Sequence, residues 1–129
     1  MEYKEIGSTH NRPDGERMID TSQLLIDIPS FIKQIKSEKQ WKQGDRNSIT
    51  VFKSGKMRIV LIGLRKKAGM HTQHPENVLS IYVIDGKITV ETQFIKVKIS
   101  RDQILALHEN VPYTITAVKK TMILLTIVE

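Results

Sequence analysis

The chain has 129 residues, which fits one domain, and it contains no cysteine, so disulfides, thiolate nucleophiles and cysteine-ligated zinc sites are excluded. Its net charge of +6 would suit an anionic partner, but the basic residues fall at expected turns and are not interleaved with stacking aromatic side chains, so we expect no nucleic-acid partner. The polar N-terminus does not resemble a signal peptide, and no apolar run is long enough to span a membrane. We therefore expect a cytoplasmic protein without a membrane partner.

The polar residues 1–20 predict an N-terminal arm, and residues 21–129 predict a single domain. A helix is predicted over about 29–39, because Pro29 suits a first helical turn and apolar residues recur at helical spacing: Ile28, Phe31, Ile32 and Ile35. The apolar stripe of this helix must pack against something. With the apolar run 24–26 beside it, we expect a homodimer that buries this surface.

From residue 48 the pattern changes to short β-prone runs separated by turn residues, at 48–53, 57–64, 78–84, 87–92, 94–99, 103–108, 113–118 and 121–128. Residues 65–77 are expected to form a long loop. Asp85 and Gly86 have the composition of a type I′ hairpin turn. No helix separates these runs, which argues against a parallel βαβ fold. The sequence thus predicts an all-β, antiparallel jelly-roll barrel over about 48–129.

Two stretches of the barrel resemble the motifs of the cupins. The first cupin motif has two histidines, a glutamate and then a glycine at the next turn, and His74, the apolar strand after it and Gly86 match that outline. The second motif runs from an acidic turn through an apolar strand to a proline and a third histidine, and residues 101–107 and Pro112 match it. The resemblance implies a single cupin jelly roll, similar to small bacterial cupins of unassigned function, preceded by a short arm and one α-helix.

The chain departs from the cupin pattern where the family holds its metal. Leu79 stands at the position of the glutamate, Thr72 at that of the first histidine and Tyr113 at that of the third. Of the family's ligands, only His74 carries over cleanly. The expected cofactor is therefore none or a weakly bound divalent metal.

A metal set built from other residues stays open, because a divalent metal needs three or four converging ligands. The candidate metal ligands are His71, His74 and His108, with the phenol of Tyr113 as a further donor. The competing interpretation is that these are loop histidines without a metal, and the missing carboxylate favours it.

The strand after His74 predicts a ligand pocket. Leu79 and Ile81 share one face, and the place of Leu79 in the cupin pattern implies that this face looks into the barrel. The candidate ligand-binding residues are His74, Leu79, Ile81 and Tyr113. They describe an apolar pocket with a few polar groups, the usual form of a small-molecule site.

Three functions are compatible with this pattern. The favoured one is a cupin-like barrel that binds a small organic ligand without a full metal site. The alternative is a metal-dependent cupin enzyme of the oxygenase or isomerase type with rearranged ligands. The third is a structural or interaction protein whose barrel is merely filled. The sequence leaves catalytic activity open, because no nucleophile elbow or carboxylate pair is evident.

Overall fold

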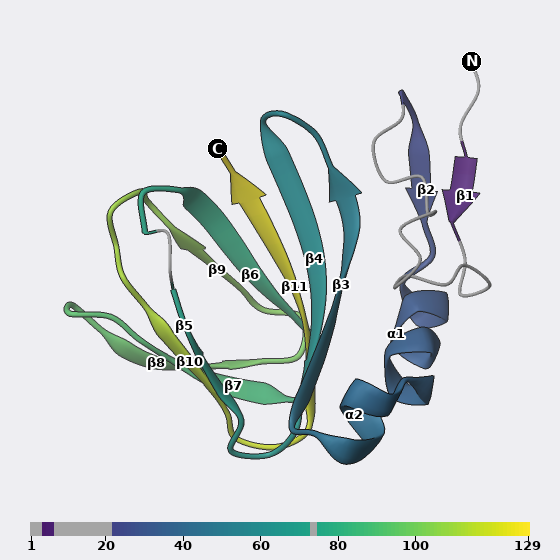
Figure 1. Ribbon diagram of the computed structural model, residues 1–129. Helices are drawn as coiled ribbons and strands as arrows, with labels where there is room; N and C mark the ends of the chain where they lie inside the picture. The colour runs from purple at the N-terminus through teal and green to yellow at the C-terminus, as the bar shows by residue number, and fades with distance from the viewer. Residues whose placement is uncertain (1–3, 7–21, 73–74) are drawn as a thin grey trace.

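The computed structural model describes residues 4–6, 22–72 and 75–129. Two antiparallel sheets face each other, with helices outside the larger one (Figure 1). The larger sheet has the order β3 (Arg46–Lys53), β4 (Met57–Leu64), β11 (Thr121–Val128), β6 (Val78–Asp85), β9 (Ile104–Leu107). The smaller has the order β5 (Gly69–His71), β10 (Thr114–Ala117), β7 (Lys87–Glu91), β8 (Lys96–Ser100). The predicted all-β jelly roll is thus confirmed.

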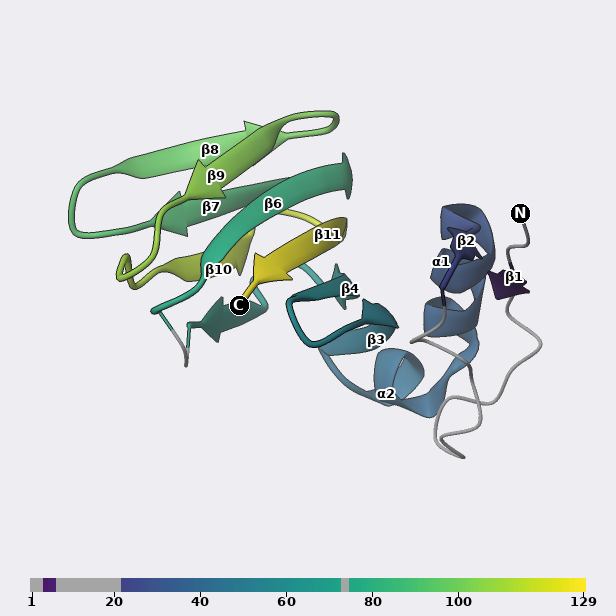
Figure 2. The same ribbon diagram turned by 90° about the horizontal axis from the view of Figure 1, so that it is seen from above.

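The core between the sheets follows from the alternation along the strands. In β6, Leu79, Ile81 and Val83 are buried, whereas the residues between them are partly exposed. The smaller sheet contributes its own inward-facing residues to this core, among them Ile88 and Ile115, which are fully buried. Figure 2 shows the two sheets from above, with the inner faces toward each other and the helices beyond β3. Strands with one buried face therefore make a sandwich with an apolar interior.

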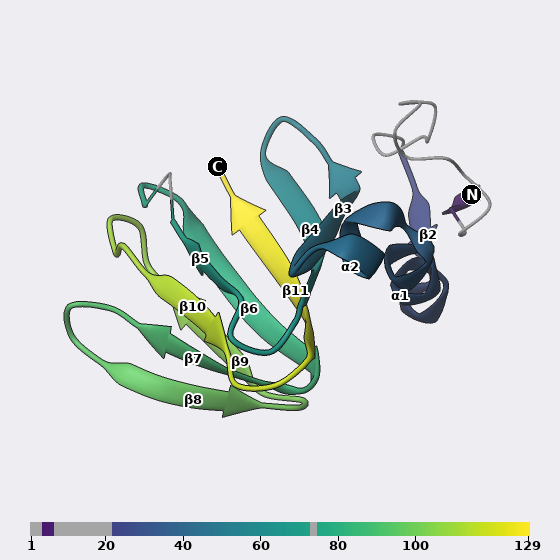
Figure 3. The same ribbon diagram turned by 60° about the horizontal axis from the view of Figure 1, so that its bottom comes forward.

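A second apolar cluster lies on the outer face of the larger sheet. Helix α1 (Ile28–Ser37) places Phe31 and Ile35, both fully buried, against Ile49 and Leu61 of β3 and β4. Figure 3 shows α1 and α2 (Lys39–Gln43) beside β3, away from the smaller sheet. The predicted helix is confirmed in α1, and it is followed by the short helix α2, which the sequence pattern did not predict.

The two helices are separated at Glu38, whose backbone is extended. A buried polar contact holds this break against the sheet. The side-chain amide of Asn47 donates to the carbonyl of Ile35 at 3.1 Å and to Oε1 of Glu38 at 2.8 Å. The Ile35 carbonyl also accepts from the Glu38 amide at 3.3 Å, so Asn47 adds a second donor where α1 ends and ties that end to β3.

The aromatic anchor of α2 is Trp41, which is buried against the same outer face. Arg65 covers it: the guanidinium carbon lies 4.2 Å from the centre of the indole ring, and Nη2 donates to the Trp41 carbonyl at 2.9 Å. Arg65 is the first residue of the basic run 65–67. One of the three positive charges of that run therefore packs on Trp41 instead of being free for a partner.

The predicted type I′ hairpin at Asp85 and Gly86 is wrong. Strand β6 belongs to the larger sheet and β7 to the smaller one, so the chain changes sheets at Gly86. Gly86 has φ of +104°, and its backbone lies against Lys120 and Thr121, where the chain returns from β10 to β11. The buried Thr121 hydroxyl holds the corner by accepting from the Lys87 amide at 3.0 Å. A short turn between two apolar strands has the same sequence composition in two cases: when the strands pair with each other, and when the chain passes from one sheet to the other.

Other strand boundaries also differ from the sequence prediction, and β3 begins at Arg46 instead of residue 48. The predicted strand at 94–99 begins only at Lys96, because the Thr92 hydroxyl accepts from the amides of Phe94 and Ile95 and forms a turn there. Phe94 is 73% exposed. The predicted loop 65–77 contains β5, a three-residue strand that pairs with β10.

The N-terminal part of the chain is described only in pieces. Strand β1 (Lys4–Ile6) pairs in parallel with β2 (Leu24–Ile26), while the rest of the predicted arm lies outside the described residues. Since the stripe of α1 finds its partner in its own chain, the homodimer stays a prediction that now depends on residues such as Leu25, which is 46% exposed. None of the helices in the described part of the chain is long and apolar enough to cross a membrane.

Candidate functional site

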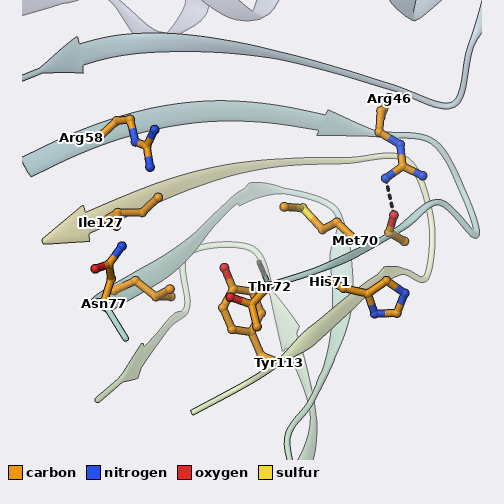
Figure 4. A pocket seen from close by; sticks show the side chains of 10 residues that line it. Arg46, Arg58, Met70, His71, Thr72, Asn77, Tyr113 and Ile127 are labelled. Atoms are coloured by element: carbon orange, nitrogen blue, oxygen red, sulfur yellow. Dashed lines mark hydrogen bonds between the residues drawn. The ribbon is translucent and has the colours of Figure 1, made fainter. Parts of the chain in front are cut away.

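A pocket of about 600 Å³ opens between the two sheets (Figure 4). The larger sheet and the residue before β6 contribute Arg46, Arg58, Asn77, Leu79 and Ile127; the smaller sheet and its flanking residues contribute Gly69, Met70, His71, Thr72 and Tyr113. This volume lies within the range of small-molecule sites.

One wall is a cross-strand row of the larger sheet. Arg58 of β4 pairs with Ile127 of β11, and Ile127 pairs with Leu79 of β6. Arg58 shares its face with Val60 and Ile62, two and four residues on, and both belong to or pack against the core between the sheets. The row therefore carries one charged group at the end of an apolar surface, on the inner side of the sheet.

The opposite wall is formed where β5 ends and β10 begins. The Thr72 amide donates to the Tyr113 carbonyl at 3.0 Å, and Figure 4 shows the two side chains close together. Next to them, Nδ1 of His71 lies 3.1 Å from the Thr114 hydroxyl. The residues that the cupin resemblance assigned to three ligand positions, Thr72, Leu79 and Tyr113, thus all line this one pocket.

Burial raises the pKa of the Tyr113 phenol, and the neighbouring Thr72 hydroxyl lowers it by a smaller amount. The side chain is 7% exposed. Because the charged form is disfavoured, Tyr113 presents a neutral hydroxyl to the pocket at neutral pH.

We expect Tyr113 to ionise above the ordinary phenol pKa of about 10. A group with a raised folded pKa contributes stability that is full below its unfolded pKa and is lost as pH rises through the folded pKa. The measurement is the Cζ chemical shift of ¹³C-labelled tyrosines against pH, assigned with Tyr113→Phe. Tyr82, whose pKa is raised by its hydrogen bond to Asp102, is assigned separately with Tyr82→Phe. Titration of Tyr113 at or below 10 would contradict this expectation.

The far end of the pocket is bounded by Arg46. Its guanidinium donates to Asp45 through Nε and Nη2, both at 3.0 Å, and to the carbonyl of Gly69 through Nη1. The side-chain hydrogen bond from Arg46 lowers the pKa of Asp45. Arg46 therefore joins β3 to β5, the edge strands of the two sheets.

The remaining predicted site residues do not all meet here. Ile81 is fully buried in the core and is not among the residues that line the pocket. His108 is exposed, after β9, and does not line the pocket either. His74 lies outside the described residues.

The described residues do not form a recognisable metal site. Among residues 4–6, 22–72 and 75–129, no three histidine, aspartate or glutamate side chains come together as metal ligands. In the described lining, His71 is the one histidine and no carboxylate is present; Thr72, Asn77 and Tyr113 offer only neutral oxygen atoms, and Leu79 offers no donor. That set does not fit the three or four ligands that a divalent metal needs.

Sequence reasoning missed six of the ten lining residues: Arg46, Arg58, Gly69, Met70, Asn77 and Ile127. The alternation of β4 could have found Arg58, because it falls on the same face as Val60 and Ile62. Arg46 gave no such signal, since it precedes the strand predicted from residue 48.

No protein-family model matches the sequence, and neither does any of the curated proteins. Solved structures do. A cupin superfamily protein from Desulfitobacterium hafniense DCB-2 matches with a TM-score of 0.67 over 87% of this chain and 95% of its own, at 10% identity. The chain has the cupin fold. A cupin 2 conserved barrel domain protein from Leptotrichia buccalis has the same TM-score at 18% identity, and the match covers 76% of this chain and 45% of that chain. The conserved SPY1581 protein of unknown function from Streptococcus pyogenes matches with a TM-score of 0.60 at 17% identity. This match covers 67% of this chain and 76% of that chain. At these identities the likeness shows the fold alone.

Proposed function

We propose that this cupin binds a small organic molecule in the pocket between its two sheets. The observation that carries the proposal is the hollow of about 600 Å³ on which Thr72, Leu79 and Tyr113 converge. A barrel that was merely filled by its own side chains would leave no space of that size there. The pocket combines an apolar surface with a few polar groups, as small-molecule sites do.

The lining is suited to binding rather than to a recognisable reaction. Leu79, Ile127 and Met70 offer apolar surface, and Asn77 and the neutral Tyr113 hydroxyl offer hydrogen bonds. Binding without turnover, as in a sensory barrel, is the function that these groups support best.

Filling the pocket should abolish this binding. Ile127 is half-buried and lines the pocket, whereas the neighbouring Val128 is 45% exposed and does not. We expect Ile127→Trp to lose the compounds that the wild type binds, and Val128→Trp to keep them. The measurement is saturation-transfer NMR with a library of small organic compounds. If no compound binds the wild type, or if bound compounds persist in Ile127→Trp, the proposal is wrong.

The alternative is a metal-dependent enzyme, and one observation favours it: His71 lies in the pocket lining beside Thr72 and Tyr113. Under the binding function that we propose, a divalent metal binds weakly or not at all, because Leu79 stands where the cupin pattern has a carboxylate. A metal at a hundredfold excess over its dissociation constant would add about 2.7 kcal/mol of stability. We therefore expect little change in Tm with manganese, nickel or zinc. A large rise in the wild type that vanishes in His74→Ala would instead support the enzyme.

A further inference from the structure

We propose that the pocket selects an organic carboxylate, with the carboxylate on Arg58 and the apolar body of the ligand against Ile127 and Leu79. This inference rests on the proposed function, because it names the chemical class that the same pocket takes.

Arg58 has donors that the protein does not satisfy. Its Nε is buried and has no hydrogen-bond partner. Its nearest ion-pair contact runs from Nη2 to Oε1 of Glu129 at 3.6 Å, which is longer than a good hydrogen bond. A guanidinium has five N–H donors and no acceptor, and burying one of them unpaired is unfavourable. A ligand that accepts from Nε would remove this cost.

Arg46, the other arginine in the pocket lining, can be compared with Arg58. It has the same side chain and lines the same pocket, yet its guanidinium is used by Asp45 and by the Gly69 carbonyl. Its structural role is therefore accounted for within the chain. Figure 4 shows the two arginines at opposite ends of the pocket, with Asn77 and Ile127 near Arg58 and His71 near Arg46. The guanidinium that is left to bind a ligand is therefore that of Arg58.

Apart from Glu129, whose Oε1 lies 3.6 Å from Nη2, the groups around Arg58 favour an anion. Lys53 stands directly opposite it in the ladder between β3 and β4, and like charges at such positions repel. No aspartate or glutamate is found among the described residues that line the pocket. Asn77 and the neutral Tyr113 hydroxyl add uncharged hydrogen-bonding groups. A bound anion would offset the repulsion between Lys53 and Arg58.

The neighbours of Arg58 in its own row favour a carboxylate with an apolar body over a phosphate. A guanidinium matches the two oxygens of a carboxylate in a bidentate pair. Beyond it, the row continues with Ile127 and Leu79, which offer carbon surface and no further donor. The ligand class that fits both features is a small organic acid.

The test is titration of the ¹⁵N-labelled protein with hexanoate, with hexanamide as its uncharged analogue and with inorganic phosphate. The Nε–H resonance of arginine is observable directly, and that of Arg58 is assigned with Arg58→Lys. We expect hexanoate to shift this resonance and to bind at least tenfold more tightly than hexanamide. Arg58→Gln should reduce hexanoate affinity about tenfold to a hundredfold and leave hexanamide affinity unchanged. Lys53→Gln, the control on the neighbouring strand, should reduce hexanoate affinity by much less.

The outcomes separate this inference from the proposed function. If library compounds occupy the pocket but hexanoate shows no advantage over hexanamide, carboxylate selection is wrong and the binding function stands. If Arg58→Gln and Arg58→Lys both keep the full preference for hexanoate, the charge is recognised elsewhere and the assignment to Arg58 is wrong. If phosphate shifts the Arg58 resonance and hexanoate does not, the site takes an inorganic anion and the carboxylate class is wrong.

Discussion

Replacement of Gly86 by alanine is expected to lower the free energy of unfolding by about 3–5 kcal/mol, the range of severe single substitutions. Gly86 has φ of +104°, a conformation that residues with a Cβ rarely adopt. The space is also occupied. A Cβ at this position would lie 2.3 Å from the Thr121 hydroxyl oxygen and 2.6 Å from the Lys120 carbonyl oxygen. Because the second of these atoms is backbone, the clash can be relieved only if the backbone of one of the two sheet-changing segments moves.

The measurement is chemical denaturation followed by circular dichroism, and Gly55→Ala is the matched control. A Cβ at Gly55 would meet no atom within 4 Å, and its φ is not in the positive range. Alanine there should leave stability unchanged or raise it slightly, because it restricts the unfolded chain. Equal stability of the Gly86→Ala and Gly55→Ala proteins would contradict the account of the corner.

Phe31→Ala is expected to cost about 3–5 kcal/mol, the usual range for removing a buried phenylalanine. Phe31 is fully buried and belongs to the cluster that holds α1 on the outer face of the larger sheet, with Ile35, Ile49 and Leu61. Truncation leaves a cavity between a helix and a rigid sheet. Neither element can close that cavity without giving up other contacts.

Lys33→Ala is the control on the same helix, because Lys33 is exposed and alanine keeps helix propensity. Its effect should stay within about 0.5 kcal/mol. A small effect of Phe31→Ala, comparable to that of Lys33→Ala, would mean that α1 is not docked on the sheet in solution.

Much of the fold could be predicted from the sequence because its strands have one buried face. The alternation of Leu79, Ile81 and Val83 predicted β6, and its burial confirmed the face. The failures came where local composition does not determine the partner. Asp85 and Gly86 look like a hairpin turn, yet the strands on either side lie in different sheets. Strand β5 is too short to show the alternation of apolar and polar residues that predicts a strand. It is recognised only from its pairing with β10.

The candidate site was predicted in outline by the cupin resemblance and in detail by none of the sequence patterns. Thr72, Leu79 and Tyr113 were assigned to one place from the family's motifs, and they do line one pocket. The two arginines were not found, because a charged residue near a predicted turn is read as solvated surface. Only the register of β4 against β11 shows that Arg58 stands in line with Ile127 and Leu79.

The attachment of Arg46 to Gly69 bears on how this protein could be divided or recombined. Arg46 comes directly after the turn that leaves α2, ahead of the barrel boundary expected at residue 48. It still connects an edge strand of one sheet to an edge strand of the other at one end of the pocket. A chimera that took only residues 48–129 would carry both sheets but leave this fastening behind. A barrel fragment that keeps this contact would have to begin at or before Asp45, because Arg46 donates both to Asp45 and to Gly69. Changes in the turn at Gly44 and Asp45 would then reach the pocket through a single side chain.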